Sequence, residues 1–233
     1  MALIKTLAEI QAVLPKVASS LSNFSILNNF DRVENKHIIP LIGRTLYTAL
    51  QTAYDANTLS TEQAKLVKHI QLVSAAYSFF DELGQQMLTF GDTGVRKISQ
   101  GGNTPIFNWE LTETKNALLK AAYDGTEVLL NYLFDKKADY PDWTASDEYK
   151  KINNLLIKTG TDLDKQRSVY QPQRTFFLIQ GIMEDVQLMY IQDDIGKELL
   201  AYLRDAAAPT DDEKECINLL KKALALFTIE KAC

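Results

Sequence analysis

Apolar residues recur at helical spacing along most of this chain. The longest regular run follows Ser60, where the spacing alternates between four and three residues through Leu66, Ile70, Val73, Tyr77, Phe80, Gly84 and Met87. Such spacing places all of these residues on one side of a helix. Ser60 and Gln63 also have the spacing of a capping box, in which each side chain bonds the backbone amide of the other residue. The pattern therefore predicts a long helix that begins after Ser60 and is central to the fold.

The same periodicity predicts helices along most of the remaining chain. We expect them over residues 3–14, 31–39, 44–56, 110–134, 146–159, 175–191, 195–204 and from 210 onward. Residues 18–30 and 160–173 are polar, and we expect them to form loops or irregular structure. The sequence thus predicts an all-α, multi-helix bundle.

One glycine-rich stretch, residues 91–109, interrupts the helical pattern. Two short runs, 95–99 and 104–107, flank residues 100–103, which favours either a β-hairpin or an extended arm. A two-stranded hairpin is only marginally stable alone, so this arm must pack on its own helices or on a neighbouring chain. Its candidate partner-contact residues are Arg96, Lys97, Ile98, Ile106 and Phe107.

The segment 37–50 combines dense apolar residues with Pro40 and Gly43. The residue before a proline is disfavoured in the helical region, so Ile39 is expected to end or kink a helix. Gly43 can adopt a left-handed backbone conformation that other residues resist. Leu46 and Leu50 follow one helical turn apart, with Tyr47 beside them. We interpret Pro40, Gly43 and Tyr47 as a structural elbow that joins two helices to the core.

Composition narrows the class of protein. The chain has 233 residues, 46% of them hydrophobic and 24% charged, which is ordinary for a globular protein with one core or two small helical subdomains. The net charge of −5 gives no general attraction to nucleic acid. No segment approaches the roughly 18 apolar residues that span a bilayer, and the N-terminus lacks a signal-peptide pattern. We expect a soluble protein made in the cytoplasm, without direct nucleic-acid or membrane partners.

Residues that carry chemistry are sparse. The histidines, His37 and His69, have no ligand partner three or four residues away, and the two cysteines, Cys216 and Cys233, lack zinc-site spacing. Four acidic pairs, at 162/164, 184/185, 193/194 and 211/212, lack the spacing of a calcium loop. Nucleophile-elbow and phosphate-loop motifs are absent from the sequence. We therefore predict no catalytic, metal or cofactor-binding residues and a protein that is not an enzyme.

The last predicted helix, with apolar positions Ile217, Leu220, Leu224 and Phe227, runs to Cys233 without a terminating signal. A helix C-terminus usually carries a glycine or a polar tail. Either the final turn frays or this chain is the N-terminal part of a longer protein, and the missing signal favours the second explanation. The expected organisation is a single helical domain over residues 1–233 with the arm at 91–109.

Several segments resemble an uncharacterised helical family encoded by phages and prophage-like regions of Bacteroidetes. They are the elbow at 39–47, the glycine-rich segment at 94–96, and residues 142–146 with 154–159. The Ile-Pro-x-x-Gly-x-x-x-Tyr elbow also resembles head–tail connector proteins of tailed phages. The resemblance extends over about residues 30–230.

This resemblance implies a non-enzymatic virion assembly protein. Such a protein acts through protein–protein contacts, by self-association or by binding other virion proteins, and ends in the virion. A monomeric helical module that binds a ligand or a host protein is the alternative. A deep pocket with convergent polar groups and a perturbed ionisable residue would favour that alternative.

Overall fold

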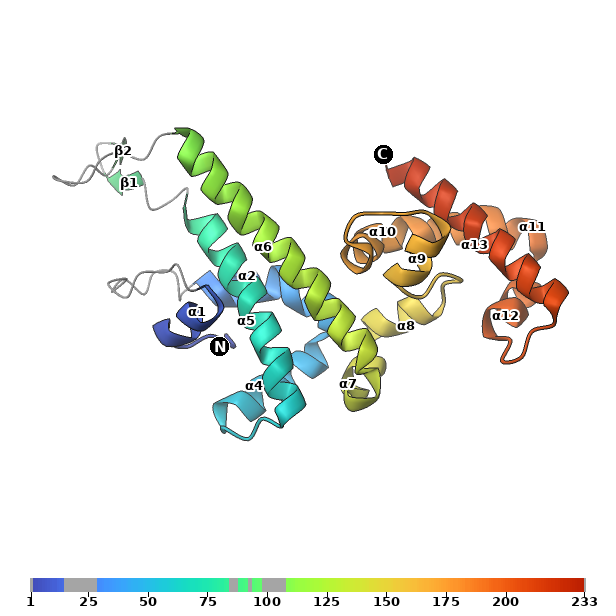
Figure 1. Ribbon diagram of the computed structural model, residues 1–233, viewed down its shortest axis with the longest axis horizontal. Coiled ribbons are helices and arrows are strands. Elements are labelled where there is room, and N and C mark those ends of the chain that lie inside the picture. The colour runs from blue at the N-terminus through green and yellow to red at the C-terminus, as the bar shows by residue number, and fades with distance from the viewer. Residues whose placement is uncertain (1, 15–28, 84–87, 92–93, 98–107, 233) are drawn as a thin grey trace. The chain divides into compact units, whose positions relative to one another are not determined.

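The computed structural model describes residues 2–14, 29–83, 88–91, 94–97 and 108–232, and their fold is helical (Figure 1). The predicted all-α class is confirmed, with one short β-hairpin among the described residues. The expected organisation was a single helical domain, and the composition allowed either one core or two small helical subdomains. The chain divides into two compact units, Met1–Asp139 and Tyr140–Cys233.

The first unit is organised around its two long helices. Its elements are α1 (Leu7–Val13), α2 (Phe30–Val33), the π-helix η2 (Glu34–Ile38), α3 (Ile39–Ile42), α4 (Arg44–Asp55), α5 (Thr61–Glu82), β1 (Leu88–Gly91), β2 (Gly94–Lys97), α6 (Asn108–Asp135) and the 3₁₀ turn η3 (Lys137–Asp139). The predicted capping box is confirmed, because Ser60 and Gln63 exchange hydrogen bonds of 2.9 and 3.2 Å. The predicted helix after Ser60 ends at Glu82, and Gly84 and Met87 lie outside the described residues.

Helices α5 and α6 pack along each other over most of their length (Figure 1). A Cβ atom on Gly125 would lie 3.1 Å from Cγ2 of Val73, so glycine allows a close approach at this point. Towards the start of α5, the Tyr132 hydroxyl donates to the Glu62 carboxylate at 2.6 Å. The two helices are therefore antiparallel, and α6 covers one face of α5.

The second unit contains shorter helices and one long C-terminal helix. Its elements are α7 (Pro141–Thr144), α8 (Asp147–Asn153), α9 (Gly160–Gln166), α10 (Pro172–Val186), the π-helix η4 (Gln187–Gln192), α11 (Asp193–Ile195), α12 (Lys197–Asp205) and α13 (Asp211–Ala232). Trp143 is fully buried, and its ring packs edge-on against Tyr149 at 4.9 Å.

Two predicted boundaries were wrong for the same reason, an N-cap threonine. The first helix begins at Leu7 rather than residue 3, because Thr6 forms a capping box with Glu9. The helix expected over residues 146–159 ends earlier, because α8 stops at Asn153. The polar stretch 160–173, which was expected to be irregular, begins with the helix α9. Thr159 starts α9 by accepting a 3.0 Å hydrogen bond from the backbone of Asp162. The loop expected over residues 18–30 lies largely outside the described residues.

The hairpin prediction was correct for one strand and wrong for its partner. Strand β2 covers most of the expected run 95–99, but it pairs with β1 in an antiparallel register that places Phe90 opposite Val95. The expected partner was 104–107. Only residues 92 and 93 separate the two strands in sequence, and two-residue connections are the commonest in hairpins.

The elbow forms, but Pro40 does not interrupt the helix. Gly43 has φ 78° and ψ 150°, as its predicted role requires, and Leu46, Tyr47 and Leu50 are buried. Ile39 is helical (φ −57°, ψ −39°), so the helix does not end there, as one of the two predicted outcomes required. The Ile39 amide donates to the carbonyl of Glu34, five residues back, and this wider turn makes room for the proline ring.

The two units repeat one order of elements. Residues 3–6 and 156–159 are both Leu-Ile-Lys-Thr, and in each copy the threonine caps a seven-residue helix, α1 or α9. In each copy the lysine forms an ion pair with the last residue of the elbow helix: Lys5 with Asp55, and Lys158 with Asp205.

The second elbow repeats the geometry of the first. Gly196 has φ 84° and ψ 149°, close to the values at Gly43. Each glycine follows a π-helix and a short α-helix, and precedes an elbow helix, α4 or α12. Asp193 opens α11, at the position that corresponds to Pro40, so the π-turn does not depend on proline.

The long helices α5 and α13 complete the correspondence. Both have 22 residues, and both begin at a capping box, which in α13 is formed by Thr210 and Glu213. In the second unit, described to Ala232, no helix corresponds to α6.

Candidate functional site

Glu34 is a fully buried carboxylate at the start of η2. It accepts the backbone N–H of Leu3 at 3.2 Å from each oxygen, and the Tyr47 hydroxyl donates to it. Burial raises the pKa of Glu34 to about 7, against the effect of these hydrogen bonds. Burial, together with the Glu34 charge, also raises the pKa of Tyr47. Glu34 thus links the N-terminal segment, the π-helix and α4, and Tyr47 contributes to the elbow from inside the core.

The second unit makes the corresponding contact between its π-helix and the Leu-Ile-Lys-Thr segment without a charge. The Gln187 side chain accepts the backbone N–H of Leu156 at 2.7 Å and donates to the Asn154 carbonyl at 2.8 Å. Leu200 takes the place of Tyr47, so the carboxylate and its hydroxyl donor are replaced together. Because a neutral amide makes the corresponding contact with the backbone, we assign Glu34 a structural role.

Both histidines pack against tyrosines. The His37 ring stacks on Tyr77 with centroids 3.8 Å apart, and the His69 ring meets Tyr132 at 5.2 Å. Burial lowers the pKa of both imidazoles. In the part of the chain that the structure describes, no three His, Cys, Asp or Glu residues group as metal ligands would.

An open hollow of about 650 Å³ lies beside α4. Its lining consists of Arg44, Thr45, Thr48, Ala49, Thr52, Ala53 and Thr58. All of these except Thr58 belong to α4, so the hollow is the outer face of one helix. Glu34, whose pKa is raised, does not line it.

The structure describes only part of the predicted contact arm. Arg96 and Lys97 lie in β2, opposite Thr89 and Leu88 of β1. Ile98, Ile106 and Phe107 lie outside the described residues. Their contact with a partner stays a prediction.

Among the residues whose side chains the structure describes, exposed large apolar side chains are concentrated in the second unit, which the sequence did not indicate. In the described part of the first unit they are Trp109 and Val128, whereas the second unit has Tyr170, Leu178, Leu188, Met189, Tyr190, Leu199, Tyr202, Leu219, Leu226 and Phe227. Tyr190 stacks on Phe227 at 5.8 Å and thereby joins η4 to α13. Exposed apolar side chains that adjoin one another, as Tyr190 and Phe227 do, commonly mark a surface that binds another molecule.

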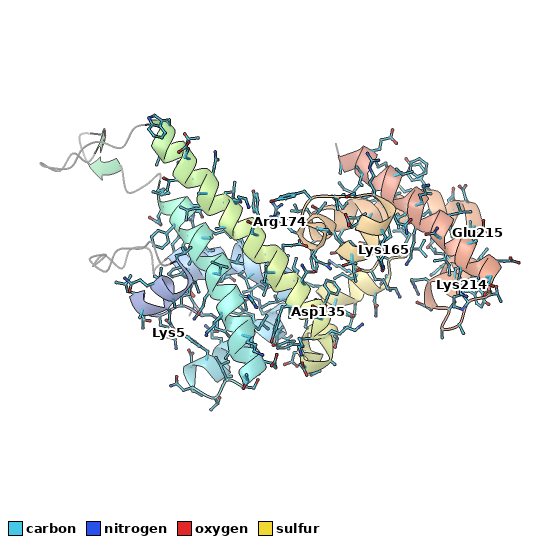
Figure 2. All side chains as sticks on the ribbon, in the orientation of Figure 1. Lys5, Asp135, Lys165, Arg174, Lys214 and Glu215 are labelled. Carbon is cyan, nitrogen blue, oxygen red and sulfur yellow. The ribbon has the colours of Figure 1, made fainter. Side chains whose placement is uncertain are left out.

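Helix α13 presents one continuous seam to solvent. Cys216, Leu219, Lys222, Leu226 and Glu230 are exposed, and their spacing of three and four residues places them on one face. Glu215, labelled in Figure 2, is exposed beside this seam. The opposite face contributes Leu224, Ala225 and Thr228 to the core.

In the described residues, no helix is both long enough and apolar enough to cross a membrane. Neither the curated proteins nor the solved structures include a match to this chain. Residues 38–153, from the last residue of η2 to the last residue of α8, match the model of a family of unknown function (DUF6712), and the expected likeness to an uncharacterised family is thereby confirmed.

Proposed function

We propose that this protein is a non-enzymatic assembly component that acts through protein–protein contacts, first of all by self-association. The observation that carries the proposal is the exposed apolar surface of the second unit. Tyr170, Leu178 and Met189 are 71%, 64% and 62% exposed. Covering apolar surface yields about 25 cal/mol per Å², so several such side chains together supply a substantial drive for association.

The finer proposal is a head–tail connector-like protein of a phage or prophage of Bacteroidetes. It rests on the resemblance of the Ile-Pro-x-x-Gly-x-x-x-Tyr elbow, which contains Pro40, Gly43 and Tyr47. In this mechanism helical bodies interlock into a ring, and the arm at 91–109 reaches a neighbouring subunit. The protein is made in the cytoplasm and enters the virion, where other virion proteins are its further partners.

Light scattering coupled to size-exclusion chromatography tests self-association. We expect the mass to exceed the 26.3 kDa of one chain and to rise with concentration. Met189→Glu places a charge on the exposed apolar surface and should lower the assembled fraction. Asn116→Glu, which adds the same charge to an exposed polar position of α6, should leave the assembled fraction unchanged.

The arm makes a separate contribution to this test. If it reaches a neighbour, the double variant Arg96→Glu with Lys97→Glu also lowers the assembled fraction. A mass of one chain at every concentration would contradict the proposal and favour a monomeric ligand-binding or host-interaction module.

A further inference from the structure

The two elbows share one backbone geometry and expose the same positions to solvent. A single alignment without insertions pairs Glu34 with Gln187 and Gly43 with Gly196. Seven outward positions are exposed in both units. We call them the first elbow face, which consists of Asp31, Arg32, Asn35, Lys36, Pro40, Arg44 and Thr45, and the second elbow face, which consists of Glu184, Asp185, Leu188, Met189, Asp193, Lys197 and Glu198.

The first elbow face is basic and polar. It carries three cations, Arg32, Lys36 and Arg44, and one carboxylate, Asp31. The Arg44 guanidinium donates to the side chain of Asn35 at 3.1 Å, and this contact connects the start of α4 to η2. Arg44 also lines the hollow beside α4, whose other lining residues are threonines and alanines. A surface that docks on this face therefore meets positive charge beside a hollow that is lined partly by methyl groups.

The second elbow face is acidic and apolar. Four of its residues carry a carboxylate and one carries a cation. Among them, Leu188 and Met189 are 46% and 62% exposed. The first unit has Asn35 and Lys36 at these two positions, so the elbow fold does not require apolar side chains there. The second elbow face therefore exposes apolar side chains, set among negative charges, for a reason other than the fold of the elbow.

We propose that the second elbow face of one copy docks on the first elbow face of another copy. This inference rests on the self-association proposed above and names the two surfaces that meet. The apolar side chains of the second elbow face are covered against the hollow beside α4, and its carboxylates approach the cations of the first. Met189 suits such a hollow, because an unbranched side chain adapts to the available shape. Tyr190 stacks on Phe227, so the apolar surface continues from the second elbow face onto α13.

Charge selects a contact between unlike faces. Two second elbow faces brought together would oppose carboxylates, and two first elbow faces would oppose cations, and both arrangements cost free energy. Contact between unlike faces pairs opposite charges instead. Exposed ion pairs add little affinity, so these pairs mainly fix the orientation, and the covered apolar side chains supply the affinity. Because each copy carries one face of each kind, the contact is heterologous and further copies can add at either end.

Charge reversal on the full chain tests the proposal, with association read by light scattering coupled to size-exclusion chromatography. One variant, Lys36→Glu with Arg44→Glu, makes the first elbow face acidic. The other variant, Asp185→Lys with Asp193→Lys, makes the second elbow face basic. Each variant alone then presents the same sign of charge on both of its elbow faces. We expect its apparent association constant to fall roughly tenfold or more, because like charges now oppose each other.

Mixing the two variants should restore association. In an equimolar mixture every acidic face can meet a basic one, so at the same total concentration the assembled fraction should return towards that of the unchanged chain. Asp142→Lys with Asp147→Lys makes the same change of charge at exposed positions of α7 and α8, outside the elbow face, and should assemble as the unchanged chain does. Circular dichroism should show the same helix content for all of these variants.

Three outcomes would overturn the proposal, and they separate it from the self-association on which it rests. If the chain associates and either variant alone associates as well as the unchanged chain, self-association stands but the elbow faces are not its interface. If both variants associate weakly and the mixture does not recover, the two faces do not dock on each other. A chain that is monomeric at every concentration would contradict both the self-association and the docking of the elbow faces.

Discussion

Replacing Glu34 by glutamine should remove a pH dependence from the stability of the first unit. The second unit provides the precedent, because Gln187 makes the corresponding contact with the backbone of Leu156. A glutamine at position 34 can still accept the Leu3 amide and the Tyr47 hydroxyl proton. The substitution therefore removes the titration and keeps the connection.

The sign and size of the effect follow from the pKa of Glu34, which burial raises from 4.5 to about 7. The native state then holds the proton more tightly than the unfolded state. The associated stability is fully present below pH 4.5 and is lost as the pH rises to about 7. One pKa unit corresponds to about 1.4 kcal/mol, so the free energy of unfolding should fall by about 2–3 kcal/mol between pH 5 and pH 8 from this group alone.

Amide hydrogen exchange of α4, read by mass spectrometry, reports the opening free energy of the first unit separately from the second. The measured quantity is the difference in pH dependence between the unchanged chain and Glu34→Gln. This difference removes the opposing contribution of His37 and His69, whose lowered pKa values destabilise the fold at acidic pH. Glu113→Gln, at an exposed position of α6, is the matched control and should behave as the unchanged chain does. Equal pH dependence with glutamate and glutamine at position 34 would refute the reasoning.

Four further substitutions test the second unit by urea unfolding. Gly196→Ala should destabilise the second unit by about 1 kcal/mol or more, because φ is 84° at this residue. Gly181→Ala should stabilise it by up to about 1 kcal/mol, because Gly181 lies inside α10 with open space around it. Equal effects of the two substitutions would contradict the assigned backbone conformations. Thr159→Ala should cost about 1 kcal/mol through loss of the N-cap of α9, and an unchanged midpoint would mean that the cap is dispensable. Trp143→Ala should cost about 3–5 kcal/mol, because its fully buried ring leaves a cavity, and a loss below 1 kcal/mol would show that the ring is not in the core.

Periodicity predicted the long helices well because their apolar faces are continuous. The helix end considered at Ile39 was wrong, because the rule for residues before proline assumes α-helical geometry, and a π-turn changes that geometry. Periodicity also failed at α9, because the sequence of this helix is polar. The helix is stabilised by the Thr159 cap and by a 2.8 Å hydrogen bond from the Gly160 amide to the side chain of Gln173, a contact distant in sequence.

The repeat was present in the sequence as the two Leu-Ile-Lys-Thr segments at 3–6 and 156–159. Four residues are too short a match to stand out alone. The remaining correspondences are geometric, such as the backbone angles of Gly43 and Gly196 and the exchange of Glu34 for Gln187. They become visible only when the folded elements are compared.

The candidate surface was the least predictable part. The apolar residues of α13 predict a helix with a buried face, and Leu224 is indeed buried. Phe227, predicted on the same stripe, is 46% exposed, because in the part of the second unit that the structure describes no helix corresponds to α6. Sequence spacing shows that a face is apolar, but whether it is covered depends on the elements around it.

The most direct measurement compares hydrogen exchange of α13 with that of α5, two 22-residue helices with the same capping box in one chain. We predict that α13 exchanges faster than α5 at low protein concentration, and that raising the protein concentration slows exchange in α13 more than in α5. If α13 is already as protected as α5, and the protein concentration alters neither helix, then the exposed apolar side chains of α13 are not part of an interface and the account is wrong.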